Sequence, residues 1–194
     1  MRNEKATNEY VVVDFDLNEF MSQCEGINEE LISRTCFFAG CANQGLIVSF
    51  DNQDDQYVQI RARAKTEIEY AINKGYINFI SGMALGFDTM CAEIVLELRE
   101  KYSHISLICA LPYKKHYKSW TSPQRKRHKQ VLKDADIVRY VSKKYTENCM
   151  LERSGYLLNN SSLLIALHNG KSREVEYTIN LATKGGLEVK VIDI

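Results

Sequence analysis

Short apolar runs alternate with longer amphipathic segments from Thr35 to the C-terminus. Short continuous apolar runs are typical of buried strands, and apolar residues three or four positions apart are typical of helices. The predicted strands are Thr35–Ala39, Ile77–Ser81, Ile105–Leu111, Asp136–Val141, Leu163–His168 and Leu187–Asp193. The predicted helices between them are Tyr57–Lys74, Gly86–Tyr102, Pro123–Ala135, Asn148–Asn160 and Val175–Lys184. The first has apolar residues at helical spacing at Val58, Ala62, Ile68 and Ile72. The second has Met90, Ile94, Val95 and Leu98 on one face.

This regular alternation of strand and helix predicts the α/β fold class. Near-continuous apolar strands indicate a mainly parallel sheet that is covered on both faces. Right-handed crossovers then give a Rossmann-like, doubly wound sheet of about six strands with helices on both faces. In such sheets ligands bind beyond the carboxyl ends of the strands, so we expect a site in the segments that directly follow the strands.

The first 34 residues break this rhythm and are predicted to form a short N-terminal appendage to a domain of residues 35–194. They hold eight acidic and three basic residues, a net charge of −5. Tyr10–Phe15 fits a strand and Leu17–Ser33 a helix. One interpretation is an extra edge strand and helix that pack on the sheet. The other is a partner-binding or dimerising arm, and we therefore expect a homo-oligomer.

Composition excludes several classes of protein. The chain has 194 residues, enough for one domain with a sizeable core. Its 25 basic and 25 acidic residues cancel, and no apolar run approaches the roughly 18 residues of a membrane span, so we expect no membrane partner. The six cysteines form no CxxC pair, and Cys36, Cys91 and Cys109 fit buried thiols in a reducing cytoplasm. No metal motif is present, and we expect neither a metal nor a cofactor.

The segment Phe79–Glu93, FISGMALGFDTMCAE, holds the most informative motif, Ser-Gly-x-x-x-Gly between a strand and a helix. Glycine lets the backbone approach a ligand, and a helix N-terminus offers free N–H groups to an anion. The spacing matches neither G-x-G-x-x-G nor a Walker A loop. The alternative is a tight turn with Asp88 favoured in the first helical turn. The predicted ligand-binding residues here are Ser81, Gly82, Met83, Ala84, Leu85, Gly86 and Asp88.

At these residues the sequence resembles a known family. SGMALGFDTMCAEIVLELRE is similar to the Gly-Ala-Leu-Gly-x-Asp motif of the YpsA family in the SLOG superfamily, which also contains DprA and the lysine-decarboxylase-like cytokinin-activating enzymes. Further similar segments follow the same order: TCFFAG, LPYKKHYKSW, ADIV, CMLERSGYLLNNSSLLIA and YTINLATKGGLEVKVI. The resemblance implies a Rossmann-like fold and a pocket for nucleotide-type ligands, without implying one activity.

Four departures from the family pattern lie near predicted strand ends. Gly40-Cys41-Ala42-Asn43 replaces Gly-His-Arg-Pro, Arg153-Ser154 replaces Arg-Asn, and Asn159 replaces Asp. Where a Gly-Gly-Thr-like loop is expected, the chain has Gly170 to Val175, in which Lys171 and Arg173 offer side chains to an anion. The ligand therefore differs from the usual one, or binding has been lost. The candidates added here are Gly40, Cys41, Asn43, Arg153, Gly170, Lys171, Ser172 and Arg173.

The segment Lys114–Lys129 holds seven basic residues, no acid and interleaved aromatic residues. It fits a nucleic-acid surface, a solvated helix face, or a basic rim that attracts an anionic nucleotide, with Trp120 as lid or stacking platform. We prefer the rim, because the segment begins at the end of the predicted strand Ile105–Leu111. Zero net charge argues against nucleic acid as the main partner.

Catalytic candidates are few. Glu93 with Arg153 could act around a ribose, although Glu93 could instead pair with a helix terminus or a neighbouring lysine. We therefore expect binding of a nucleotide-derived small molecule, with phosphate and ribose (ADP-ribose-like or a cyclic nucleotide), by a sensor, sequestering or regulatory protein. The alternatives are an N-glycosidase or phosphohydrolase acting on such a ligand, and DprA-like nucleic-acid binding.

Overall fold

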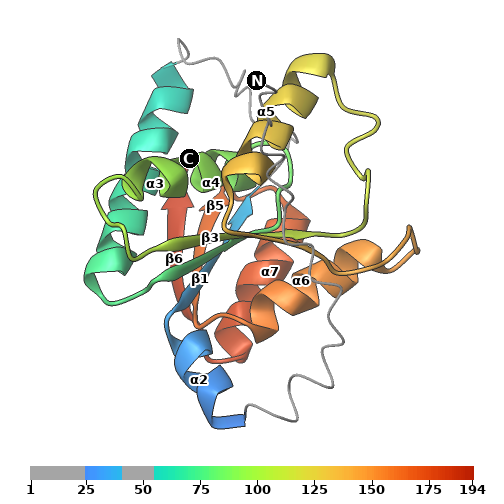
Figure 1. Ribbon diagram of the computed structural model, residues 1–194. Helices are drawn as coiled ribbons and strands as arrows, with labels where there is room; N and C mark the ends of the chain where they lie inside the picture. The colour runs from blue at the N-terminus through green and yellow to red at the C-terminus, as the bar shows by residue number, and fades with distance from the viewer. Residues whose placement is uncertain (1–24, 41–54) are drawn as a thin grey trace, which may run out of the picture.

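The computed structural model describes residues 25–40 and 55–194 (Figure 1). Strands and helices alternate close to the predicted bounds. The strands are β1 (Thr35–Gly40), β2 (Asn78–Ser81), β3 (Ser106–Leu111), β4 (Ile137–Tyr140), β5 (Leu163–His168) and β6 (Glu188–Asp193). The helices are α2 (Glu25–Ser33), α3 (Asp55–Asn73), α4 (Phe87–Leu98), α5 (Ser122–Asp134), α6 (Cys149–Asn159) and α7 (Arg173–Lys184).

The six strands form one sheet in the order β4-β3-β2-β1-β5-β6, and every neighbouring pair is parallel. The predicted Rossmann-like fold is therefore confirmed. From β1 the chain builds the sheet outward through β2, β3 and β4, and then returns to the other side of β1 with β5. The strand order reverses between β1 and β5, where Gly40 pairs with Leu167. Open α/β sheets bind ligands at such a reversal.

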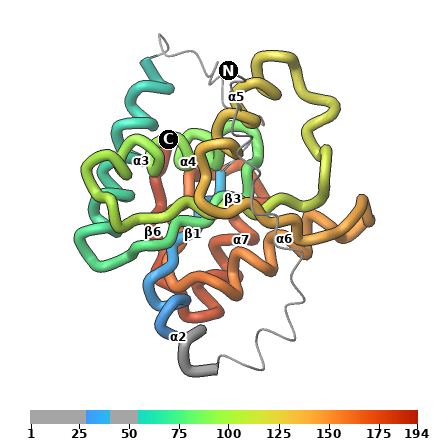
Figure 2. The backbone as a smooth tube through the Cα atoms, in the orientation of Figure 1, coloured from blue at the N-terminus to red at the C-terminus, as the bar shows by residue number. Residues whose placement is uncertain are grey.

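Helices cover both faces of the sheet, and α6 and α7 lie together on the face opposite α3 and α4 (Figures 1 and 2). Successive side chains of a strand point to opposite faces, so neighbouring residues of β1 enter different cores. Phe38 packs with residues of α3 and α4, including Ile60 and Met90. Phe37 packs instead with Leu157 of α6 and with residues of α7.

The buried face of α3 differs from the one predicted. Val58 is 49% exposed and Ala62 is also exposed, whereas Ile68 and Ile72 are buried as expected. The buried face instead consists of Tyr57, Ile60, Ala64, Ile68, Ala71 and Ile72. In α4 the predicted face holds, because Met90, Ile94, Val95 and Leu98 are all buried.

Helix α2 coincides with the C-terminal part of the helix predicted over Leu17–Ser33. Its end is joined to the domain by hydrogen bonds: Arg34 Nε donates to Gly75 O at 3.1 Å, and Ser162 Oγ donates to Ser33 O at 2.9 Å. The predicted strand Tyr10–Phe15 lies outside the described residues, so the oligomeric arm stays a prediction.

Four cysteines in the described part of the chain, Cys36, Cys91, Cys109 and Cys149, are buried and free. This agrees with the expectation of buried thiols at the first three. None of the helices described here has the length and hydropathy that a membrane crossing requires.

Candidate ligand site at the carboxyl edge of the sheet

A cavity of about 130 Å³ lies at the carboxyl end of β1, next to the strand-order reversal. Gly40 closes β1 beside it, and Ala84 and Asp88 reach it from the β2–α4 connection. The other wall comes from two helices in i, i+4 pairs, Arg153 with Leu157 on α6 and Glu174 with Thr178 on α7. The rest of the lining is Phe37, Phe38, Ala39, Ser154 and Val175.

The loop between β2 and α4 is a fixed turn held by its own side chains. Ser81 Oγ donates to Asp88 O at 2.9 Å and accepts from Met83 N at 3.1 Å, while Thr89 Oγ1 donates to Ala84 O at 2.8 Å. Gly86 precedes α4 with φ 94°, a left-handed conformation that favours glycine. The hydroxyl of Ser81 is therefore engaged within the loop.

Asp88 turns its carboxylate back onto this edge of the sheet. The side chain is buried, and it accepts hydrogen bonds from the backbone N–H groups of Gly40 and Ala84. Burial raises its pKa to about 6, against the opposing effects of Arg153 and the two amides. The motif predicts free N–H groups in this loop for an anion. Those of Met83 and Ala84 are not free, because Ser81 and Asp88 already accept them.

Gly82 brings a charged pair of side chains close to the backbone. A Cβ atom built on Gly82 would lie 3.0 Å from Asp88 Oδ2 and 3.4 Å from Arg153 Cζ. Arg153 Nη1 donates to Gly82 O at 3.1 Å, and its Nε is buried without a hydrogen-bond partner among the described residues. Arg153 therefore supplies the positive charge of the cavity lining, and one of its buried donors has no partner among the described residues.

The loop after β5 was expected to offer side chains to an anion, but its two basic residues do not line the cavity. Gly170 has φ 70°, and Asn169 Oδ1 accepts from the backbone N of Lys171 and of Ser172 at 3.0 and 3.2 Å. Ser172 is buried and its Oγ caps α7 by accepting from Val175 N at 3.4 Å. The side chains of Lys171 and Arg173 are exposed and do not line the cavity.

The remaining candidates divide into two groups. Leu85 and Gly86 belong to the β2–α4 loop, next to the cavity residue Ala84. Cys41 and Asn43 lie outside the described residues. Within those residues, no cluster of three or more histidine, cysteine, aspartate or glutamate side chains is arranged to hold a metal ion.

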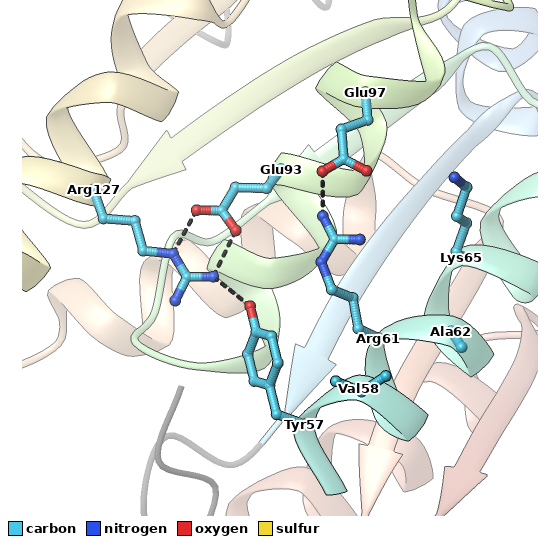
Figure 3. A pocket seen from close by; sticks show the side chains of 8 residues that line it. All are labelled: Tyr57, Val58, Arg61, Ala62, Lys65, Glu93, Glu97 and Arg127. Carbon is cyan, nitrogen blue, oxygen red and sulfur yellow. Dashed lines mark hydrogen bonds and ion pairs between the residues drawn. The ribbon is translucent and has the colours of Figure 1, made fainter. Parts of the chain in front are cut away.

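Glu93 lies in a second hollow, a groove of about 820 Å³ formed over α3, α4 and α5 (Figure 3). Arg127 Nη2 donates to Glu93 Oε2 at 2.5 Å and to the hydroxyl of Tyr57 at 3.0 Å, and its Nε donates to the other oxygen of Glu93. A neighbouring ion pair joins Arg61 to Glu97. The carboxylate of Glu93 is thus neutralised by Arg127 on α5, and the structure places Glu93 and Arg153 at different hollows.

Trp120 belongs to a compact group of rings at the start of α5. Its ring lies 5.3 Å from that of His116 and 5.1 Å from that of His128, between centroids. Burial lowers the pKa of His116 to about 4 and that of His128 to about 3, so both are neutral near pH 7. Trp120 lines neither of the two hollows described above.

Sequence reasoning missed part of the cavity wall. Ser154, Leu157 and Thr178 line it but were not among the candidates. The signal that could have found Leu157 and Thr178 is helical spacing, since residues four apart share a helix face. Leu157 follows Arg153 at this spacing, and Thr178 follows Glu174.

Comparison with known proteins agrees with the resemblance seen in the sequence. The YpsA family model, described as the "YspA SLOG family", matches residues 36–190. The SPbeta prophage-derived protein YoqJ of Bacillus subtilis is 26% identical over 140 residues, covering 66% of this chain and 82% of the relative. A UPF0398 protein of Halalkalibacterium halodurans is 27% identical over 128 residues, covering 64% of this chain and 68% of that protein.

Two solved structures share the fold. DNA processing protein A of Helicobacter pylori aligns with a TM-score of 0.54 and 14% identity, covering 86% of this chain and 67% of that one. DprA of Streptococcus pneumoniae aligns with a TM-score of 0.52 and 11% identity, covering 84% of this chain and 51% of that one. At these identities the likeness concerns the fold.

One expectation about partners has to be corrected. We expected nucleic acid not to be a partner, because the whole chain carries no net charge. The H. pylori protein of this fold is described by its single-stranded DNA binding mode, which contradicts that exclusion. Net charge averages over the whole chain and hides a local excess, such as the basic segment Lys114–Lys129.

Proposed function

The chain belongs to the YpsA family of the SLOG superfamily, and from this premise we propose that it binds a nucleotide-derived small molecule at the cavity beside β1. Family and fold fit a nucleotide-related binding role. The observation that carries the proposal is the position of Arg153, which lines this cavity and whose buried Nε has no hydrogen-bond partner among the described residues. An arginine at the strand-order reversal is suited to a polar ligand that offers hydrogen-bond acceptors.

The size of the cavity limits what enters it. At about 130 Å³ it is well below the roughly 300–1,000 Å³ of pockets that enclose a drug-sized ligand. One group of the ligand enters, and the rest lies outside the cavity along the carboxyl edge of the sheet. The exposed side chains of Lys171 and Arg173 are close in sequence to the cavity residue Glu174 and carry positive charge for that outer part.

Binding without turnover is the form of the proposal that the side chains support. Acid–base catalysis needs groups held within reach of the reacting atoms. Glu93, the carboxylate first considered for this role, is paired with Arg127 in the other hollow. We therefore propose a sensor, sequestering or regulatory protein rather than an N-glycosidase or phosphohydrolase.

Isothermal titration calorimetry with AMP, ADP-ribose and 3′,5′-cyclic AMP tests this proposal. Arg153→Gln should weaken binding at least tenfold, because a hydrogen bond to a charged group contributes about 1.5–3 kcal/mol. The matched control is Arg34→Gln, which also loses one donor to a backbone carbonyl but stands at the start of β1. No binding by the wild type, or equal losses in both variants, would refute the proposal. Chromatography after incubation should return the nucleotide intact.

A second candidate function is the binding of single-stranded nucleic acid, and a different surface favours it. Two loops leave neighbouring strands side by side, since Val141 N donates to Leu111 O at 2.8 Å and Ser142 N to Pro112 O at 2.9 Å. They carry what we call the lysine–tyrosine face: Tyr113, Lys114, Lys115, Lys118, Lys143, Lys144 and Tyr145. All five lysines are exposed, and the rings of Tyr113 and Tyr145 lie 5.5 Å apart.

Lysines beside an exposed ring suit a single strand, because the lysines neutralise phosphates while a base stacks on the ring. The solved structure of the H. pylori protein of this fold is described by its single-stranded DNA binding mode. Fluorescence anisotropy with a labelled oligothymidylate separates this candidate from the first. Tyr145→Ala should weaken binding about tenfold, since base stacking contributes about 1–3 kcal/mol. The control is Tyr177→Ala on α7, where the residue is 58% exposed against 65% for Tyr145. Equal losses of oligonucleotide affinity in Tyr145→Ala and Tyr177→Ala would refute the lysine–tyrosine face as the binding surface.

A further inference from the structure

The charges around the cavity do not suit a phosphate at its inner end. Two carboxylates, Asp88 and Glu174, line it together with one guanidinium, that of Arg153. Asp88 is the buried one of the two carboxylates, and it already accepts the amides of Gly40 and Ala84. A phosphate placed here would meet a carboxylate where a phosphate loop offers free N–H groups.

The acceptor capacity of Asp88 is not exhausted by these amides. An ionised carboxylate offers about four lone-pair sites on its two oxygens, and the two amides use two of them. Arg153 brings a donor to the same space, since both side chains lie near the point where a Cβ of Gly82 would stand. Among the described residues, the two make no direct ion pair.

A group that fits between them has to donate to Asp88 and accept from Arg153. A fully ionised phosphate accepts but has no proton to donate to an ionised carboxylate, and an ammonium donates but cannot accept. A hydroxyl does both. Two adjacent hydroxyls also match the two remaining acceptor sites of Asp88. The vicinal diol of a ribose is therefore a part of a nucleotide whose chemistry fits this cavity.

We propose that the cavity takes the ribose diol of the ligand, with Asp88 as the acceptor that determines specificity for ribose over deoxyribose and Arg153 as the donor beside it. The proposal rests on the proposed function, in that the ligand is nucleotide-derived. It places the phosphate outside the cavity, toward the exposed side chains of Lys171 and Arg173. The Cβ of a residue larger than glycine at position 82 would crowd both side chains.

Proton uptake by Asp88 gives the proposal a distinct readout. In the described residues, Asp88 is faced by Arg153 from α6, by Glu174 across the cavity from α7 and by the thiol of Cys91 on its own helix. The pKa of Asp88 is raised to about 6, mainly by burial. Protonation removes acceptor sites, so binding of a diol weakens as the pH falls through 6. A phosphate held against Asp88 would show the opposite trend.

Calorimetry with three probes, AMP, 2′,3′-dideoxy-AMP and ribose 5-phosphate, tests the proposal. At pH 7.5 the wild type should bind AMP at least tenfold more tightly than dideoxy-AMP, and this ratio should shrink toward one at pH 5. Asp88→Asn should abolish the preference at pH 7.5. The comparison of AMP with dideoxy-AMP needs no variant, so a folding defect in Asp88→Asn would leave the test intact.

The possible outcomes separate failure of the ribose site from failure of nucleotide binding. Equal affinities for AMP and dideoxy-AMP, or tighter binding of both at pH 5, would overturn the ribose site and leave nucleotide binding standing. A folded Asp88→Asn protein that keeps the preference would also overturn the role of Asp88. Binding of ribose 5-phosphate but not of AMP would support the diol site and refute the nucleotide. No binding of any probe would overturn both proposals.

Discussion

Replacing Gly40 with alanine is expected to destabilise the whole domain. A Cβ atom at this position would lie 2.4 Å from Phe87 Cβ and 2.8 Å from two atoms of its ring. Phe87 is fully buried in the first turn of α4, and its Cβ is fixed to the helix backbone, so a change of rotamer cannot relieve the overlap. Either the end of β1 or the start of α4 has to move.

The magnitude follows from the cost of overpacking. An extra methyl group in a well-packed core costs about 1–3 kcal/mol. For a chain of this length the melting temperature falls by roughly 2–4 °C per kcal/mol. We therefore expect Gly40→Ala to melt roughly 2–12 °C below the wild type. Its affinity for AMP should fall as well, because Gly40 lines the cavity and its amide donates to Asp88.

Thermal unfolding followed by circular dichroism measures this effect, and Gly155→Ala is the matched control. Gly155 lies within α6, and a Cβ atom added there would meet no neighbouring atom within 4 Å. Alanine in a helix interior is more favourable than glycine by about 0.5–1 kcal/mol, so this variant should melt above the wild type. Unchanged melting of Gly40→Ala would refute the reasoning, since the overlap would then have been absorbed without strain.

Three further changes test other parts of the structure. Gly82→Ala should lower affinity for AMP more than it lowers stability, as calorimetry and melting will show together, because its close contacts belong to the cavity. Glu93→Gln should cost about 1 kcal/mol in urea unfolding and the loss should shrink at high salt, because its partly exposed pair with Arg127 joins α4 to α5. The depressed pKa values of His116 and His128 mean that stability is full above pH 6.5 and is lost as the pH falls toward 4. His128→Phe should reduce this loss of stability in a pH series of melting curves. Asp88 has a raised pKa, so its contribution to stability changes with pH in the opposite direction near pH 6, in the wild type and in the variant alike.

The order of strands and helices was predictable because each element has its own local pattern of apolar residues. Apolar runs such as Leu163–His168 form central strands, and the crossover rule then allows few arrangements. The error on α3 came from counting Val58 as core on spacing alone. Val58 has apolar neighbours at helical spacing, yet the adjacent Tyr57 and Ile60 face the sheet, and only packing decides between two such faces.

The partners of charged residues could not be predicted in the same way. Glu93 and Arg127 are 34 residues apart, on helices whose contact depends on the sheet order. From the sequence alone, a lysine or a helix terminus is an equally good partner for Glu93, because the sequence does not give the relative positions of the helices. For Asp88, the position was predictable from the sequence but the hydrogen-bond partner was not. Its position in the first turn was predicted, but its carboxylate accepts an amide of β1, which is far away in sequence.

The departures from the family pattern gain a common meaning once Asp88 is placed. The usual His-Arg after the first strand is Cys41-Ala42 here, and the last loop has fewer glycines. Both changes remove features that hold a phosphate. Among the described residues, the charged groups that line the cavity are one arginine and two carboxylates. In the proposed ribose site, hydroxyl groups hold the ligand in the cavity, and its charge is met outside, where Lys171 and Arg173 are exposed. Under this proposal, loss of the phosphate-holding features changes which end of the ligand is buried and does not by itself abolish binding.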